Sequence, residues 1–137
     1  MNVEDLRAQH EGIMRIAAEL RTAVERGDKL QPVAALRWRL ARELITHLAI
    51  EDRLFYPALM RSADAEAVRV AARLRDETGS FAADFTAYMA RWNDLRVARE
   101  WEAFRTETKT ILDALADRIT REDQALYPLA EARGRAA

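Results

Sequence analysis

One phrase of this sequence occurs twice, and the repeat limits how the chain can fold. The first copy covers residues 47–57 and the second covers residues 118–128. The two copies align without a gap and share a Glu-Asp pair and a terminal Tyr-Pro, but the first begins with His47 and the second with Arg118. A repeat of this kind predicts two structurally similar halves that place the two phrases at equivalent positions.

Apolar residues recur at steps of three and four in four successive segments, which is the spacing of a helix face that packs on a core. Asn2 and the segment 62–64 are expected to cap the first and third helices, and Gly27-Asp28 to end the first. Pro32 is expected to open the second helix, and Asn93-Asp94 to precede the fourth. The pattern predicts an all-α protein, an up-down-up-down antiparallel four-helix bundle of two pseudo-repeated helix pairs.

Three features near the helix ends carry further expectations. Gly79 lies inside the third apolar stripe and weakens the prediction of a continuous helix there. Pro57 is expected to end the second helix, because proline cannot donate the backbone hydrogen bond of a helix interior. Tyr56 and Tyr127 precede the two prolines, so we expect their rings at the rim of the bundle and their hydroxyls in water, without a chemical role.

The composition excludes several classes of function. The chain has 137 residues, half of them apolar, which predicts a single domain over residues 1–137 with a substantial core. With 22 basic and 23 acidic residues it has no charge excess that would draw it to nucleic acid or anionic lipid. It has no cysteine, and no apolar run approaches the roughly 18 residues of a membrane span. We expect a cytoplasmic protein whose partner, if it has one, is a second copy or another protein.

Five polar residues fall in register with the apolar stripes, where Leu, Ile, Val, Phe or Ala would be expected. They are His10, His47, Glu51, Arg118 and Glu122. Burying one unpaired carboxylate costs several kcal/mol, so these groups must satisfy one another or hold an ion. In an antiparallel bundle all five come near the same end.

Four of these residues form a plausible set of metal ligands. His47 and Glu51 are four residues apart and share one helix face, and His10 and Glu122 converge on the same level of the bundle. Two imidazoles and two carboxylates suit a borderline or harder divalent metal such as iron, manganese or zinc. The sequence predicts a metal site at this level of the core.

At these residues the chain resembles a hemerythrin-like protein of the cation-binding HHE class, over nearly its whole length. That resemblance implies a four-helix bundle around a non-haem di-iron centre, in which one iron has two terminal histidines, the other has three, and two carboxylates bridge the pair. By position, His10 and His47 match the terminal ligands of the two-histidine iron. Glu51 and Glu122 match the bridging carboxylates.

The second iron of such a centre lacks its ligands in this sequence. Thr78 or a near neighbour stands where the third helix should supply a histidine, Ala82 offers nothing one turn later, and Arg118 stands where the fourth helix should supply another. The chain has only two histidines. We predict that Arg118 occupies the space of this iron, offsets its charge and hydrogen-bonds Glu122 and Glu51.

Three functions remain open on these grounds. The first is a metal-binding module with an incomplete di-iron site, at most one metal ion and no competence as an oxygen carrier. The second is a metal-free helical scaffold or signalling domain in which Arg118 replaces the metal. The third, ranked last, is a non-haem iron enzyme acting on oxygen, peroxide or nitric oxide, and no catalytic residue is assigned for it.

Overall fold

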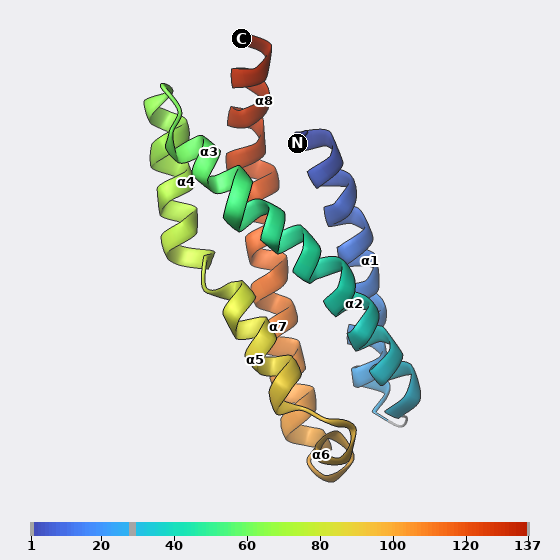
Figure 1. Ribbon diagram of the computed structural model, residues 1–137. Coiled ribbons are helices and arrows are strands. Elements are labelled where there is room, and N and C mark those ends of the chain that lie inside the picture. Colours follow the sequence, from blue (N-terminus) through green and yellow to red (C-terminus); the bar gives the residue numbers. More distant parts are fainter. Residues whose placement is uncertain (1, 28–29, 137) are drawn as a thin grey trace.

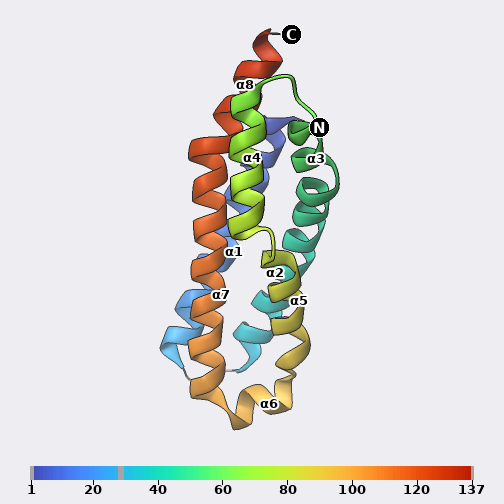
Figure 2. The ribbon, with the colours of Figure 1, turned by 90° about the vertical axis from the view of Figure 1, so that its left-hand side faces the viewer.

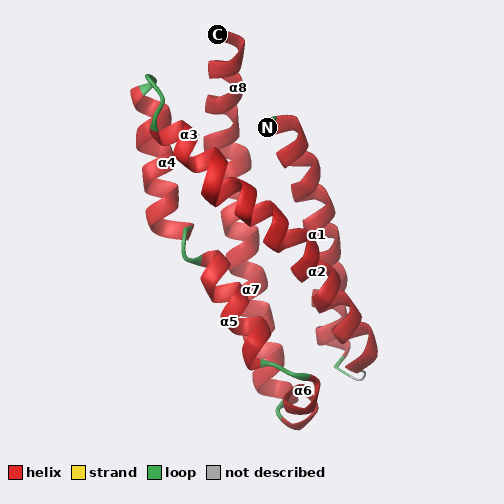
Figure 3. Cartoon of the chain, viewed as in Figure 1, coloured by secondary structure: helices red, strands yellow, loops and turns green. Residues whose placement is uncertain are grey.

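The computed structural model describes residues 2–27 and 30–136, and every regular element within these ranges is a helix (Figure 3). In chain order the elements are α1 (Val3–Arg26), α2 (Leu30–Ile50), the π-helical segment η1 (Glu51–Phe55), α3 (Tyr56–Met60), α4 (Ala65–Thr78), α5 (Phe81–Arg91), α6 (Asp94–Arg99), α7 (Trp101–Arg121), the π-helical segment η2 (Glu122–Leu126) and α8 (Tyr127–Ala136).

These elements combine into four long rods that lie side by side and alternate in direction (Figures 1 and 2). The rods are α1, then α2 with η1 and α3, then α4 with α5, and finally α7 with η2 and α8. Both ends of the drawn chain lie at the same end of the bundle, and α6 lies at the opposite end (Figure 1). The prediction of an up-down-up-down antiparallel bundle is confirmed.

Three predicted helix ends are confirmed by their capping contacts. The side chains of Asn2 and Asp64 each accept a hydrogen bond from the backbone N–H two residues further on, at 2.7 and 3.0 Å. Gly27 ends α1 in the left-handed conformation, with φ of 72°, and its N–H donates to the carbonyl of Ala23 at 3.3 Å. Asp28, expected to share this role, lies outside the described residues.

Two helix starts differ from the prediction. The second rod begins at Leu30, so Pro32 lies within its first turn, where a missing N–H still costs nothing. Asn93 caps the short helix α6, because its side chain accepts a hydrogen bond from the N–H of Arg96 at 2.8 Å. The fourth rod starts only after α6, at Trp101.

The third rod is broken at Gly79, between α4 and α5 (Figure 2). The N–H of Gly79 donates to the carbonyl of Arg75 at 2.8 Å, and a Cβ atom placed on Gly79 would collide with that carbonyl oxygen. Only a glycine at position 79 allows this close approach to the carbonyl of Arg75 without a shift of the backbone. The break follows directly after Thr78.

The expectation that Pro57 ends the second rod is wrong, because the rod continues through α3. A π-helical turn precedes the Tyr-Pro pair in both copies of the repeat, and the N–H of Tyr56 and of Tyr127 donate to the carbonyls of Glu51 and Glu122, five residues back. The wider turn relieves the crowding between a proline ring and the preceding turn of helix. The repeated phrase thus encodes the same backbone irregularity twice, each time beginning at a glutamate.

The core consists of two apolar clusters with a polar layer between them. Ile13, Leu48 and Ile119 belong to the larger cluster, and Leu6, Phe55 and Leu126 to the smaller one. On three of the four rods a buried ionisable residue separates the two clusters, and on the remaining rod a buried threonine does. None of the described helices combines the length and the apolarity needed to cross a membrane.

Candidate metal centre

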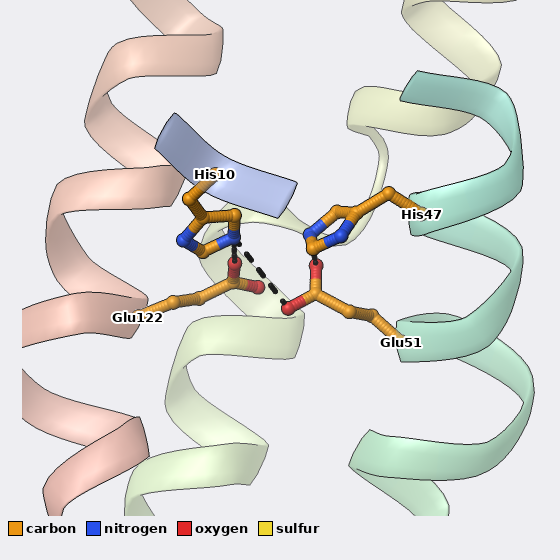
Figure 4. Close-up of side chains that lie close together, drawn as sticks. All are labelled: His10, His47, Glu51 and Glu122. Carbon is orange, nitrogen blue, oxygen red and sulfur yellow. Dashed lines mark ion pairs between the residues drawn. The ribbon is translucent and has the colours of Figure 1, made fainter. Parts of the chain in front are cut away.

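The polar layer brings together all four predicted metal ligands (Figure 4). His10 comes from α1, His47 from α2, Glu51 from η1 and Glu122 from η2, and each is at most 2% exposed. One ligand atom from each residue lies within 4.8 Å of the other three. The Nε2 of His10 is 3.2 Å from Oε1 of Glu122, and the Nε2 of His47 is 3.1 Å from Oε1 of Glu51.

The outer nitrogen of each imidazole is held by a second residue. The Nδ1 of His10 lies 2.9 Å from Oδ1 of Asp123, and the Nδ1 of His47 lies 2.7 Å from Oε1 of Gln9. A carboxylate or amide oxygen at this place fixes the proton on Nδ1, so that Nε2 faces the cluster with its lone pair. Both histidines are therefore oriented as metal-ligating histidines are.

The two tyrosines of the repeat are part of this cluster, so the expectation that their hydroxyls reach water is wrong. Tyr56 and Tyr127 are buried, and their hydroxyls donate hydrogen bonds to Glu122 Oε2 at 2.8 Å and to Glu51 Oε2 at 2.5 Å. Because the helices continue through the π-helical turns, both rings point inward. Each tyrosine thereby holds the glutamate of the other half of the molecule.

Arg118 fills the other side of the polar layer. Its Nε lies 3.1 Å from Glu122 Oε2, and its Nη2 lies 3.3 Å from Glu51 Oε1 and 2.7 Å from Asp52 Oδ1. The guanidinium also lies over the ring of Tyr56, 5.6 Å from its centroid, and only 2% of the residue is exposed. Glu122 therefore faces His10 with one oxygen and Arg118 with the other, whereas Oε1 of Glu51 lies beside both His47 and this permanent cation.

The third rod contributes no side-chain ligand at this level. The hydroxyl of Thr78 donates to the carbonyl of Leu74 at 2.7 Å, so it is engaged within its own helix. The carbonyl of Thr78 accepts a long hydrogen bond of 3.5 Å from Nη1 of Arg118. Ala82, after the break, packs against the apolar core.

The electrostatics of the cluster distinguish the two histidines. Burial and the nearby charge of His10 lower the pKa of His47 from 6.5 to about 4. Burial also opposes the charged form of His10, but the close carboxylates of Glu122 and Asp123 outweigh it and raise the pKa of His10. Burial raises the pKa of Glu122 as well. The same layer thus shifts the pKa values of its two imidazoles in opposite directions.

Two buried atoms of the cluster have no hydrogen-bond partner among the described residues, namely Nε2 of His47 and Oε1 of Glu122. Leaving such atoms unsatisfied costs about 1–3 kcal/mol each, and native proteins rarely do so. Both atoms belong to the proposed ligand set, and a cation bonded to them would satisfy both. The donor set of two imidazole nitrogens and two carboxylate oxygens therefore fits one ion of iron, manganese or zinc.

A four-helix bundle with imidazoles and carboxylates buried at one level of its core defines a class of cation-binding helical proteins. The family model of the hemerythrin HHE cation binding domain matches residues 1–130, and this chain belongs to that family. No match was found among curated proteins or among solved structures. The resemblance predicted from the repeat and the two histidines is confirmed.

Sequence reasoning missed Gln9 and misplaced Tyr56 and Tyr127. Tyrosine stands at the same place in both copies of the repeat, and this could have indicated that both tyrosines are buried. Burial restricts the residue type at a position more than exposure to solvent does. Gln9 gave no such signal, since a glutamine next to His10 in the sequence also suits the solvent face of a helix.

Proposed function

We propose that this chain is a hemerythrin-like domain that binds a single metal ion through His10, His47, Glu51 and Glu122. Iron is the expected metal, with zinc or manganese as alternatives. The observation that carries the proposal is the position of Arg118, whose guanidinium contacts one carboxylate oxygen of each of the two glutamates. The ancestral pair of metals is thus replaced by one metal and one guanidinium.

The orientation of the two imidazoles, as well as the types of the four residues, supports this single metal site. The outer nitrogens of both imidazoles are engaged by Asp123 and Gln9, which leaves both Nε2 atoms directed at the glutamates. An ion there would act as a Lewis acid or, in the case of iron, as a redox centre. The chain itself supplies orientation, because each imidazole and each glutamate is held by a further side chain.

A second metal ion is disfavoured by charge. Arg118 is always protonated, and two unit charges 4 Å apart repel by about 4 kcal/mol at an effective dielectric constant of 20. Thr78 and Ala82 offer no side-chain donor that would compensate for this repulsion. We therefore expect neither a coupled di-iron centre nor the reversible oxygen carriage that depends on one.

A metal-free scaffold is the second candidate, and the same arginine favours it. In the absence of an ion, Arg118 still pairs with Glu51 and Glu122, so part of the cluster is satisfied without metal. On the surface of α2, Trp38 is 65% exposed and Ile45 is 50% exposed, seven residues apart on one helix face. Such a face would suit a second copy of the chain or another protein.

Metal content per chain tests these proposals directly. Protein purified without a histidine tag is measured by plasma mass spectrometry before and after anaerobic loading with Fe(II) and desalting. About one iron per chain is expected, and His10→Ala and His47→Ala should each abolish it. About two irons per chain would contradict the role assigned to Arg118. No iron in either sample would refute the metal site and support the metal-free scaffold.

A matched pair of glutamate variants controls for nonspecific binding. Glu51→Gln removes a buried carboxylate of the cluster, whereas Glu19→Gln removes one on the surface whose side chain is 52% exposed. Only the first should lose iron. Equal loss in both variants would show that the bound iron does not report on the cluster.

A further inference from the structure

The two tyrosines of the repeat occupy equivalent positions but have different surroundings. The hydroxyl oxygen of Tyr127 lies 2.5 Å from Glu51 Oε2 and also 3.1 Å from Nε2 of His10. The hydroxyl of Tyr56 donates to Glu122 Oε2, and its ring faces the guanidinium of Arg118. Tyr127 therefore lies on the histidine side of the polar layer, and Tyr56 on the arginine side.

The spacing around His10 Nε2 is that of ligands around one ion. Donor atoms that each lie 2.0–2.2 Å from a metal are separated from their neighbours by roughly 3 Å. Nε2 of His10 is 3.2 Å from Glu122 Oε1 and 3.1 Å from the hydroxyl oxygen of Tyr127. The phenol oxygen of Tyr127 thus lies at nearly the same distance from Nε2 of His10 as the predicted carboxylate ligand Glu122 does.

We propose that the phenol oxygen of Tyr127 is a fifth protein ligand of the metal and makes the site selective for iron(III), whereas Tyr56 does not bind the metal. This inference rests on the single-metal site proposed above. As the iron–oxygen bond forms, the phenol O–H bond breaks and its proton is released to solvent, as happens for other protonated ligands. No electron is transferred in this step.

The charges of the cluster favour a trivalent ion in such a site. Glu51, Glu122 and a Tyr127 phenolate would contribute three negative charges, and iron(III) would balance them. Arg118 retains Asp52 as a partner at 2.7 Å. The guanidinium of Arg7 lies 5.3 Å from the centroid of the Tyr127 ring, which adds a cation beside the ring that becomes anionic.

The test is the visible spectrum of the protein loaded with iron(III) nitrilotriacetate and desalted, compared with Tyr127→Phe and Tyr56→Phe. A phenolate bound to iron(III) gives a charge-transfer band in the visible range and resonance-enhanced tyrosine ring vibrations. The wild type and Tyr56→Phe should show both. Tyr127→Phe should lose both and bind iron(III) at least about tenfold more weakly.

Each other outcome overturns the inference in a distinguishable way. About one iron per chain without the band in the wild type would refute the Tyr127 ligand and leave the single-metal site standing. Loss of the band in Tyr56→Phe but not in Tyr127→Phe would show that Tyr56, and not Tyr127, binds the iron. No bound iron in the wild type would refute the site and the ligand together.

A measurement on the unaltered chain guards against misfolding of Tyr127→Phe. Protein grown with ring-deuterated tyrosine should show shifted ring vibrations in its resonance Raman spectrum, because the enhanced modes belong to the bound phenolate. Unshifted vibrations would mean that the band does not arise from tyrosine, and the inference would fail.

Discussion

Arg118 and Glu122 lie one helical turn apart on the fourth rod, and Nε of Arg118 is 3.1 Å from Oε2 of Glu122. The opposite oxygen of Glu122 faces His10 at 3.2 Å. One carboxylate is therefore shared between a permanent cation and an imidazole, as our proposal that a guanidinium replaces one of two metals requires.

Replacement of Arg118 by leucine should strongly destabilise the metal-free protein. The change leaves Glu51 and Glu122 buried without their cation, and breaking a buried ion pair from one side costs about 3–5 kcal/mol. Urea unfolding in the presence of a chelator measures the loss. Arg21→Leu is the control, since Arg21 pairs with Asp113 at the surface and its loss should cost less than about 1 kcal/mol. Equal effects would mean that the buried network does not stabilise the fold.

Arg118→His should raise the iron content above one ion per chain. The substitution removes the fixed cation and restores one imidazole beside the two glutamates and Asp52. Plasma mass spectrometry after anaerobic Fe(II) loading measures the stoichiometry. If stoichiometry and stability both stay unchanged, Arg118 does not occupy the position of a second metal.

Metal should stabilise the folded chain, because the four ligands converge only in the bundle. A free metal concentration of 100 times the Kd adds about 2.7 kcal/mol, which for a domain of this size raises the Tm by about 10 °C. Thermal melting with Fe(II) and with a chelator measures the difference. In His47→Ala the shift should disappear, and its persistence there would exclude His47 as a ligand.

The metal-free protein should lose stability as the pH falls from 6.5 to about 4. The pKa of His47 is lowered to about 4 in the folded state, so in this window the unfolded chain binds a proton that the folded chain does not. Complete loss of this contribution amounts to about 3 kcal/mol. His10 acts the other way, because its pKa is raised and its contribution is lost only as the pH rises.

Urea unfolding at several pH values, with a chelator present, tests this window. His47→Gln removes the group and should flatten the dependence of the free energy of unfolding on pH between 6.5 and 4. An identical slope in the variant and the wild type would show that other groups govern the loss of stability in acid.

Much of the fold was accessible from the sequence because it depends on local periodicity. The three-and-four spacing of apolar residues located the rods, and the same register placed His10, His47, Glu51, Arg118 and Glu122 on the core faces. These residues do lie in one buried layer. Register is a property of each helix alone, so it does not require knowledge of the partner helices.

The sequence by itself therefore determined the bundle, its family and the residues of the polar layer, since helix period and residue type suffice for these. Only the tertiary structure decided what each residue contacts. The π-helical turns carry Tyr56 and Tyr127 inward, each onto the glutamate of the opposite half. Gln9 and Asp52 likewise acquire their partners across different rods. Such contacts depend on how the rods rotate and approach one another, and no spacing along the chain specifies that.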